Sequence, residues 1–295
     1  MTETSGKIRE KPIRILTFDV EEWFHLLDNE STKTVVEWSR YESRIHRNME
    51  RITDLLQKRR QRATFFCLGW VARKYPEVIR NLANQGYEIG SHGDMHQLVY
   101  EQNPGEFRKD LEASINVLED ITGKPVRYYR APGFSVRKDN VWAFEILAEC
   151  GIELDCSIFP VPRAHGGFPS YREPVPSILR YRGVQLRELP MSYATVAGRP
   201  LVFSGGGYFR LAPYGLIKRW TSGSGYVMTY LHPRDFDASQ PKIDGLSSVR
   251  TFKSYVGLSG ALRKIERWIT DFPFVDIGTA AEMIDWEAVP VIELK

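Results

Sequence analysis

Two histidines, His92 and His96 in the run Ser91-His92-Gly93-Asp94-Met95-His96, are the first candidates for chemistry in this sequence. In a helical turn, side chains four residues apart project to one side, so the two imidazoles could bind one metal ion. Two unrelated histidines, one capping and one packed, are the simpler interpretation. The position favours the metal, because the pair follows a short strand-like run over 87–90 and other candidate ligands hold comparable positions.

Two carboxylates follow the first predicted strand. Residues 13–18 are predicted to form a buried strand, and Asp19-Val20-Glu21-Glu22 comes directly after it. Alternate side chains of an extended chain share a face. Asp19 and Glu21 can therefore converge on one site while Val20 points into the core. A solvated acidic strand end is the competing interpretation.

The Glu21 carboxylate and two imidazoles would make a three-ligand site with room for water, the open form that metals use in catalysis. Oxygen and nitrogen ligands suit Zn²⁺ best, and iron, cobalt or nickel would also fit. Such a metal lowers the pKa of its water towards ~7 and polarises a carbonyl. Asp19, beside the metal, could take the proton from that water as a general base.

Three further polar residues also follow predicted strands. Arg130 could hold Asp19 in place and keep it ionised, and His232 could protonate a departing nitrogen as a general acid. Asp155 could orient His232 and keep it charged. Each has a structural alternative: a salt bridge for Arg130, a turn or helix cap for Asp155, and a packed strand-end histidine for His232. Together they indicate metal-assisted hydrolysis of an amide or ester.

The elements that must position these residues alternate along the chain. Strand-like runs at 63–68, 126–129, 152–154 and 226–231 are separated by amphipathic helical patterns, which indicates a mostly parallel sheet. In a closed parallel barrel the carboxyl ends of the strands share one face, and that face carries the chemistry. A helix is expected over roughly 249–270, and a short one at 279–286 after a possible strand at 274–277.

The segment 160–190 interrupts this alternation and shows no helical stripe. Its prolines, tyrosines and arginines are typical of an irregular binding loop whose rim suits a sugar or a phosphate. An ordered surface insertion without a ligand is the other interpretation. Gly205-Gly206-Gly207-Tyr208 lacks the spacing of a phosphate-binding loop and is predicted to form a turn.

Composition excludes several classes of function. The chain has 295 residues, 42% of them hydrophobic, with 40 basic and 37 acidic side chains, so a nucleic-acid partner is not expected. The apolar runs are too short to span a membrane, and residues 1–12 form a polar tail, predicted to be disordered, without a signal sequence. Three scattered cysteines favour a reducing compartment. These features predict a cytoplasmic protein.

The motifs taken in order resemble those of the polysaccharide deacetylases, the NodB-homology enzymes of carbohydrate esterase family four. The matching motifs are Thr17-Phe18-Asp19, Ser91-His92-x3-His96, Arg130-x-Pro132, Asp155-x-Ser157-x-x-Pro160 and Leu231-His232. The resemblance implies an α/β fold, a distorted (β/α) barrel of about seven parallel strands. It implies one metal bound through His92 and His96, Asp19 as base, Arg130 positioning Asp19, and His232 as acid supported by Asp155. The runs Asp19–Phe24 and Gly205–Arg210, with His232-Pro233, are similar to a branch tied to bacterial exopolysaccharide and surface-polysaccharide gene clusters.

One position departs from the family pattern. The family has two adjacent aspartates, of which the second binds the metal, and here Val20 stands in that place. The strand alternation makes Glu21 its replacement. Substrate contacts are expected at six residues, namely Pro132, Phe134, Tyr208, Leu231, Arg163 and His165.

We expect one barrel domain over 13–295, with an irregular insertion near 160–190 and C-terminal helices from 249. The expected reaction is removal of acetyl from an N-acetylated sugar or oligosaccharide, in a surface-polysaccharide, lipid-linked or nucleotide-sugar precursor. Two alternatives stay open. One is hydrolysis of a non-sugar amide, such as a cyclic imide or ureide. The other is a non-catalytic protein that binds metal or carbohydrate.

Overall fold

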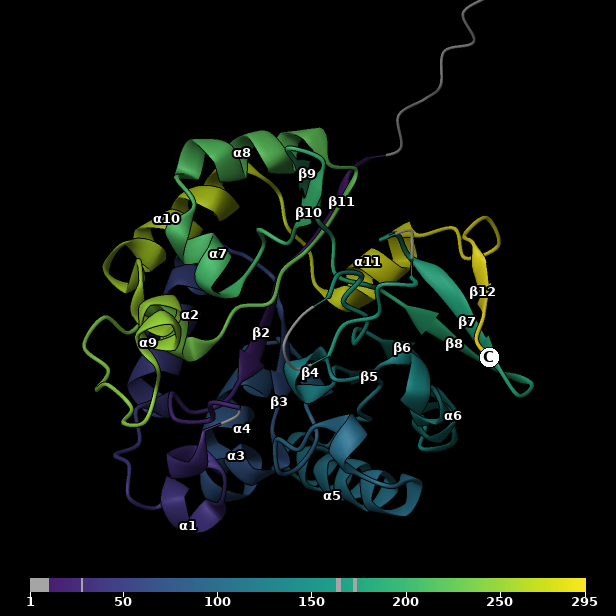
Figure 1. Ribbon diagram of the computed structural model, residues 1–295, viewed down its shortest axis with the longest axis horizontal. Helices are drawn as coiled ribbons and strands as arrows, with labels where there is room; N and C mark the ends of the chain where they lie inside the picture. Colours follow the sequence, from purple (N-terminus) through teal and green to yellow (C-terminus); the bar gives the residue numbers. More distant parts are fainter. Residues whose placement is uncertain (1–10, 28, 163–165, 172–173) are drawn as a thin grey trace, which may run out of the picture.

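The computed structural model describes residues 11–27, 29–162, 166–171 and 174–295. The predicted tail at 1–12 therefore lies almost wholly outside the described residues. The core of the fold is a distorted barrel of parallel strands (Figure 1). Its strands are β1 (Ile13–Ile15) continuing into β2 (Thr17–Val20), β3 (Thr64–Cys67), β4 (Glu88–Ser91), β5 (Tyr128–Tyr129), β6 (Leu154–Asp155), β8 (Val184–Glu188) and β11 (Tyr226–Met228).

Parallel pairing runs from β2 through β3, β4, β5 and β6 to β8, and β11 pairs with β1 on the other side. If β1 and β2 count as one strand, the described part of the barrel has the seven parallel strands expected. Between β8 and β11 the described residues form no backbone ladder. The gap is bridged by single bonds, such as Met228 N to Ser192 Oγ at 3.1 Å and Tyr226 Oη to the Pro190 carbonyl at 2.8 Å. This interruption between β8 and β11 is the feature that makes the barrel irregular.

The prediction of an irregular segment over 160–190 is wrong for its second half. Residues Ser177–Tyr181 form β7, which pairs antiparallel with β8, and β12 (Val291–Glu293) adds to β7 in parallel. The hairpin turns at Arg182-Gly183, with φ of +47° and +86°. Two left-handed residues are what a two-residue hairpin turn requires. The alternation of buried Leu179 and Leu186 with polar neighbours was the signal for these strands.

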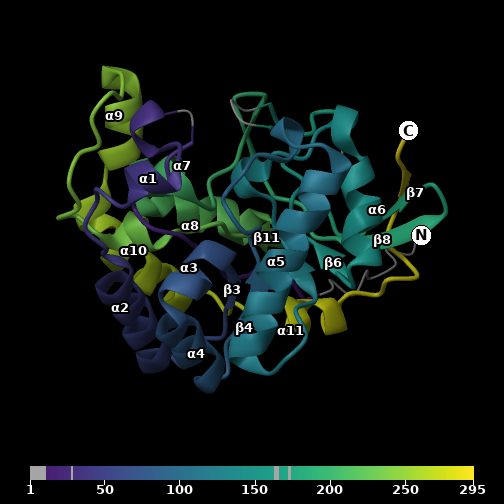
Figure 2. The ribbon, with the colours of Figure 1, turned by 90° about the horizontal axis from the view of Figure 1, so that it is seen from below.

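Helices cover the outside of the barrel (Figures 1 and 2). They are α2 (Ile45–Lys58), α3 (Gly69–Lys74), α4 (Pro76–Asn84), α5 (Pro104–Thr122), α6 (Trp142–Glu149), α8 (Tyr214–Gly223), α10 (Leu258–Asp271) and α11 (Ile277–Met283). The helix expected over 249–270 is instead two helices, α9 (Ser248–Tyr255) and α10. Gly257, at φ +73°, separates them. In the part of the chain that the structure describes, no helix has the length and apolarity needed to cross a bilayer.

Alternation along the first strand separates two layers of core. Ile15 packs with Phe66, Leu154 and Met228, side chains from different strands that fill the barrel interior. Leu16, Phe18 and Val20 pack in the layer between barrel and helices. Odd-numbered residues of this strand therefore face inward. That direction is what carries Asp19 and Glu21 to the mouth of the barrel.

Candidate active site

A pocket of about 460 Å³ opens at the carboxyl ends of the barrel strands. Asp19, Glu21, His92, His96 and His232 all line it. These residues come from the ends of β2, β4 and β11. In the barrel β3 lies between β2 and β4, and β11 pairs with β1, which continues into β2. The structure thus brings five of the predicted site residues to one cavity. Val20 is fully buried in the outer core layer, as the alternation predicts.

Glu21, His92 and His96 form a group that suits a metal ion. One ligand atom from each lies within 4.8 Å of the others. The Glu21 Oε2 is 2.7 Å from His96 Nε2. His92 Nδ1 bonds to the Arg130 carbonyl at 2.7 Å, so its Nε2 is the nitrogen left to face a cation. A backbone carbonyl that fixes the outer nitrogen is the usual support of a metal-binding histidine.

The electrostatics of this group also fit a cation. Burial lowers the pKa of His92 to about 4, so its imidazole is neutral near pH 7 and has a lone pair to offer. Burial would raise the pKa of Glu21, but the charge and hydrogen bond of His96 outweigh it and hold that pKa well below its ordinary value. One carboxylate and two imidazoles, without thiolates, form a donor set suited to zinc.

The prediction that His92 and His96 share a helical turn is wrong. The segment after β4 is an irregular loop in which Gly93 and His96 take left-handed φ values of +75° and +54°. The loop is held by Asp110 of α5, whose carboxylate accepts from the backbone N–H of Asp94 and Met95 at 2.8 and 3.0 Å. Histidine tolerates the left-handed region better than most residues. Backbone geometry, and not helical spacing, brings the two imidazoles together.

Asp19 is held by a buried arginine. Arg130 Nη1 donates to Asp19 Oδ1 at 2.7 Å and to Thr17 Oγ1 at 2.8 Å, and both charged side chains are almost completely buried. The guanidinium also lies 4.3 Å from the ring centre of Phe66. Asp19 Oδ2 remains directed at the pocket, 3.8 Å from His232 Nε2.

The carboxylate that supports His232 is Asp235, so the prediction of an Asp155–His232 pair is wrong. A 3₁₀ turn over Pro233–Phe236 folds the chain back, and Asp235 Oδ2 lies 3.2 Å from His232 Nδ1 while accepting from its backbone N–H at 3.0 Å. Arg210 contacts the other oxygen of Asp235 at 3.1 Å. Burial would lower the pKa of His232, but Asp235, Glu21 and Asp19 together raise it to about 9.

Asp155 belongs to a separate buried network. Its carboxylate accepts from the Ser157 N–H at 3.0 Å and hydroxyl at 2.6 Å, and the Ser157 oxygen accepts from the Ala131 N–H at 2.8 Å. Glu188 lies opposite Asp155 in the strand register. Burial and the Asp155 charge raise the pKa of Glu188 well above its ordinary value, which favours a protonated Glu188 beside the Asp155 carboxylate. Asp155 therefore positions the backbone beside Arg130.

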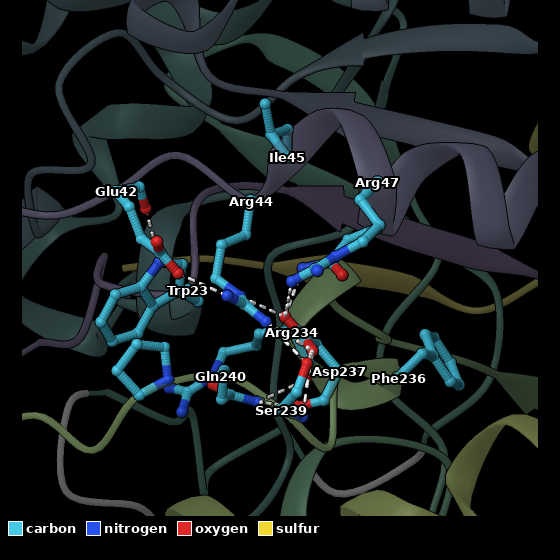
Figure 3. Close-up of polar contacts among 12 residues, drawn as sticks. Trp23, Glu42, Arg44, Ile45, Arg47, Arg234, Phe236, Asp237, Ser239 and Gln240 are labelled. Atoms are coloured by element: carbon cyan, nitrogen blue, oxygen red, sulfur yellow. Dashed lines mark hydrogen bonds and ion pairs between the residues drawn. The ribbon is translucent and has the colours of Figure 1, made fainter.

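A second ionic cluster anchors the turn that carries His232 (Figure 3). Arg44 Nε lies 2.6 Å from Asp237 Oδ2, and Asn48 and Ser239 also donate to this carboxylate. The backbone N–H groups of Arg44 and Ile45 donate to Glu22. The start of α2 thus binds both the residue after Glu21 and the end of the His232 turn.

The predicted substrate contacts are only partly at the pocket. Phe134 and Tyr208 line it, whereas Pro132 and Leu231 are buried beside it and are not among its lining residues. Arg163 and His165 lie outside the described residues. The turn predicted at 205–208 is the start of α7 (Gly206–Leu211).

Sequence reasoning missed His25, which also lines the pocket. Its ring centre is 5.7 Å from that of His96, its Nδ1 accepts from the Glu22 N–H at 3.3 Å, and its Nε2 is buried without a partner. Asp235 was also missed, although a polar residue three positions after His232, with a proline directly after that histidine, is a signal for a capping turn. Nothing in the spacing of His25 pointed to the site.

Two family models match consecutive parts of the chain. A model described as polysaccharide deacetylase matches residues 9–154, and one described as a domain of unknown function (DUF3473) matches residues 156–282. Among curated proteins, a peptidoglycan-N-acetylglucosamine deacetylase of Bacillus cereus is 30% identical over 96 residues, which is 32% of this chain and 35% of that protein. A chitooligosaccharide deacetylase of Azorhizobium caulinodans is 30% identical over 97 residues, 32% of this chain and 43% of that protein. The matches thus span less than half the length of these relatives.

Solved structures show the same fold over more of the chain. A protein of Mycobacterium smegmatis assigned as a polysaccharide deacetylase superposes with a TM-score of 0.68 and 20% identity, covering 99% of this chain and 96% of that one. The PuuE allantoinase has a TM-score of 0.60 at 14% identity, covering 94% and 91% of the two chains. A pseudoenzyme of carbohydrate esterase family four from Bacillus anthracis has a TM-score of 0.52 at 13% identity, covering 97% and 70%. At these identities the likeness shows the fold alone.

Proposed function

From the membership of residues 9–154 in the polysaccharide deacetylase family, we propose that this protein is a metal-dependent hydrolase that removes the N-acetyl group from an N-acetylated amino sugar. The observation that carries the proposal is the convergence of Asp19, a Glu-His-His group and His232 on one pocket. Each of these three features alone has a structural explanation. Together they supply a base, a cation site and an acid within reach of one small substrate.

Glu21, His92 and His96 would hold the cation. When bound there, a divalent cation supplies Lewis acidity, which stabilises negative charge as it develops on the acetamide oxygen. Zinc is the metal that this donor set favours, and iron, cobalt and nickel are outcomes that metal analysis would distinguish. The neutral state of His92 and the ionised state of Glu21 are those that binding requires.

The chain's own residues divide the proton transfers. Asp19, held in place by Arg130, accepts a proton from the attacking water through Oδ2, the oxygen that faces the pocket. His232 is protonated at neutral pH and donates from Nε2 to the departing nitrogen. Asp235 and Arg210 fix the orientation of His232 from the outer side. Water enters, and acetate and an amine leave.

The substrate class is proposed from the pocket's composition. Phe134 and Tyr208 provide aromatic faces, and Arg250 and Lys253 add positive charge at its wall. An acetamido sugar in a surface-polysaccharide precursor, with an anionic diphosphate in a lipid-linked or nucleotide-linked form, matches these features. This substrate is consistent with the sequence-based assignment to the exopolysaccharide-associated branch.

The test pairs metal analysis of the purified protein with acetate release from a panel of acetamido sugars. The panel includes nucleotide sugars, lipid-linked sugars and chitooligosaccharides, with allantoin as a ureide. We expect about one metal per chain and acetate release that Asp19→Asn reduces by at least roughly 100-fold. Asp54→Asn, an exposed aspartate on α2, is the matched control. Metal binding without turnover of any acetamide would instead establish a binding protein, and turnover of allantoin alone a ureide hydrolase.

A further inference from the structure

The end of the molecule at which the pocket opens carries a concentration of exposed apolar side chains. Among the described residues, ten large apolar or aromatic side chains are exposed, and six of these lie on α1 (Val35–Trp38), α7 and α9. Figure 2 shows these three helices toward one edge of the molecule. The six residues, here called the mouth surface, are Val35, Val36, Tyr208, Leu211, Val249 and Phe252.

Helix α9 is the most unusual part of the mouth surface. It buries none of its residues, although helices of water-soluble proteins normally turn an apolar stripe to the core. Val249 and Phe252, three residues apart on one face, are 63% and 58% exposed. The helix is attached to α7 by Arg210, whose guanidinium donates to the carbonyls of Lys253 and Ser254 at 2.9 and 2.7 Å. These bonds position α9 without covering its apolar face.

The charged residues of α7 and α9 are all positive. Neither α7 nor α9 contains an acidic residue, and Arg250 and Lys253 of α9 line the wall of the pocket. The acidic residue on α1 is Glu37, whose carboxylate bonds to Thr34 of the same turn. A short helix that carries valine and phenylalanine next to arginine and lysine has the composition of helices that lie at the surface of anionic membranes.

We propose that the mouth surface docks on an anionic phospholipid bilayer, with Val36, Val249 and Phe252 in the headgroup region and Lys253 at the lipid phosphates. A second copy of the chain is a poorer occupant. In a two-fold dimer the same patch meets itself, so the cations of α9 would face one another. Anionic lipid complements both the apolar and the positive parts of the surface.

Docking in this orientation turns the pocket toward the bilayer. A sugar linked to a membrane lipid could then enter the pocket without leaving the membrane, and its diphosphate would meet Arg250 and Lys253. This statement about the substrate rests on the proposed function, whereas the docking surface does not.

The test is co-sedimentation of the full chain with vesicles of phosphatidylcholine, with and without about one third phosphatidylglycerol. We expect binding to the anionic vesicles that weakens as salt is raised. The double variant V36S/V249S, whose two positions do not line the pocket, should bind about tenfold more weakly. The matched control is M283S/V291S, at two equally apolar positions on α11 and β12 that are 43% and 42% exposed. It should bind as the wild type does. Lys253→Glu should remove the preference for anionic lipid.

Several outcomes would overturn the docking surface. These are no binding to anionic vesicles, equal loss in the control variant, or a wild-type dimer that V36S/V249S converts to a monomer. Thermal unfolding of both double variants checks that each is folded. Vesicle binding without acetate release from any sugar would leave the surface standing and remove the proposed function. Acetate release from soluble sugars without vesicle binding would support the proposed function and overturn the docking surface.

Discussion

At the scale of single residues, the central feature is the position of Glu21, one place after the position where the family motif has its second aspartate. Asp19 and Glu21 point into the pocket because they stand two apart on a strand, and Val20 between them is buried in the core. A carboxylate at position 20 would therefore be buried away from the two imidazoles. In the proposed site, a glutamate one position later supplies the carboxylate in the direction of the pocket.

Glu21→Gln should remove metal from the protein. The variant loses the only carboxylate of the Glu-His-His group, and the cost in affinity should exceed the roughly 10- to 100-fold caused by removing a group that merely orients a ligand. Competition with a chromogenic chelator measures the dissociation constant. Glu42→Gln, at an exposed position near the start of α2, should leave it unchanged. Equal affinities in Glu21→Gln and the wild type would exclude Glu21 as a ligand.

Asp235→Asn and Asp155→Asn separate the two candidate partners of His232. Asp235 helps to raise the pKa of His232 to about 9, so the acid stays protonated below that pH and is lost as pH rises through it. Asp235→Asn should shift this alkaline limb of the pH–rate profile to lower pH. The activity should fall by less than the roughly 10²- to 10⁴-fold attributed to general acids, since His232 remains.

Asp155→Asn should leave the alkaline limb in place, because its carboxylate contacts Ser157 and Glu188 and not His232. Titration of the imidazole by NMR gives the same comparison without turnover. A shift in Asp155→Asn and none in Asp235→Asn would restore the pairing expected from the sequence.

At the scale of elements, the turn after β11 depends on helix α2. The Arg44–Asp237 ion pair is buried, with side-chain exposures of 9% and 0%, and it joins the start of α2 to the chain that follows the His232 turn (Figure 3). Breaking a buried pair from one side removes compensation from the other charge, and of its ion pairs Arg44 would keep only the one with the exposed Glu42. The same cluster therefore stabilises the fold and holds the candidate acid in place.

Asp237→Asn should lower the free energy of unfolding by roughly 3–5 kcal/mol. The hydrogen bonds with Arg44, Ser239 and Asn48 outweigh burial and lower the pKa of Asp237 to about 2. A depressed carboxylate pKa stabilises the fold above the ordinary pKa of aspartate, and this contribution is lost as pH falls from about 4 to 2. Urea unfolding across that range measures it. Asp244→Asn, on the exposed surface, should show no such loss of stability.

At the scale of the whole molecule, the barrel is closed unevenly. Strands β3, β4, β5 and β6 have a paired neighbour on each side, whereas β11 pairs with β1 and, among the described residues, meets the β8 side only through single bonds. Hydrogen exchange should therefore be slower for the amides of β3 than for those of β11. Exchange measured by mass spectrometry tests this. Equal protection of the two strands would place the weakest part of the barrel elsewhere.

The barrel and the pocket were predictable because they follow from periodicity and strand ends. Alternation placed Asp19 and Glu21 on one face, and the capped helices such as α5, from Asn103 to Gly123, were marked by local residues. The partner of His232 was not predictable, since it depends on a 3₁₀ turn that returns Asp235 to the ring. The geometry of His92 and His96 was also missed, because a loop with two left-handed residues imitates helical spacing.

The alternation at Asp19 and Glu21 also bears on how relatives of this chain should be recognised. A search pattern that requires two adjacent aspartates would reject the chain at its first motif and classify it as an inactive homologue. A pattern based on strand alternation, with an acidic residue on each side of one apolar residue, would retain it. Homologues set aside as degenerate for lacking that second aspartate merit re-examination wherever a glutamate stands one place further on.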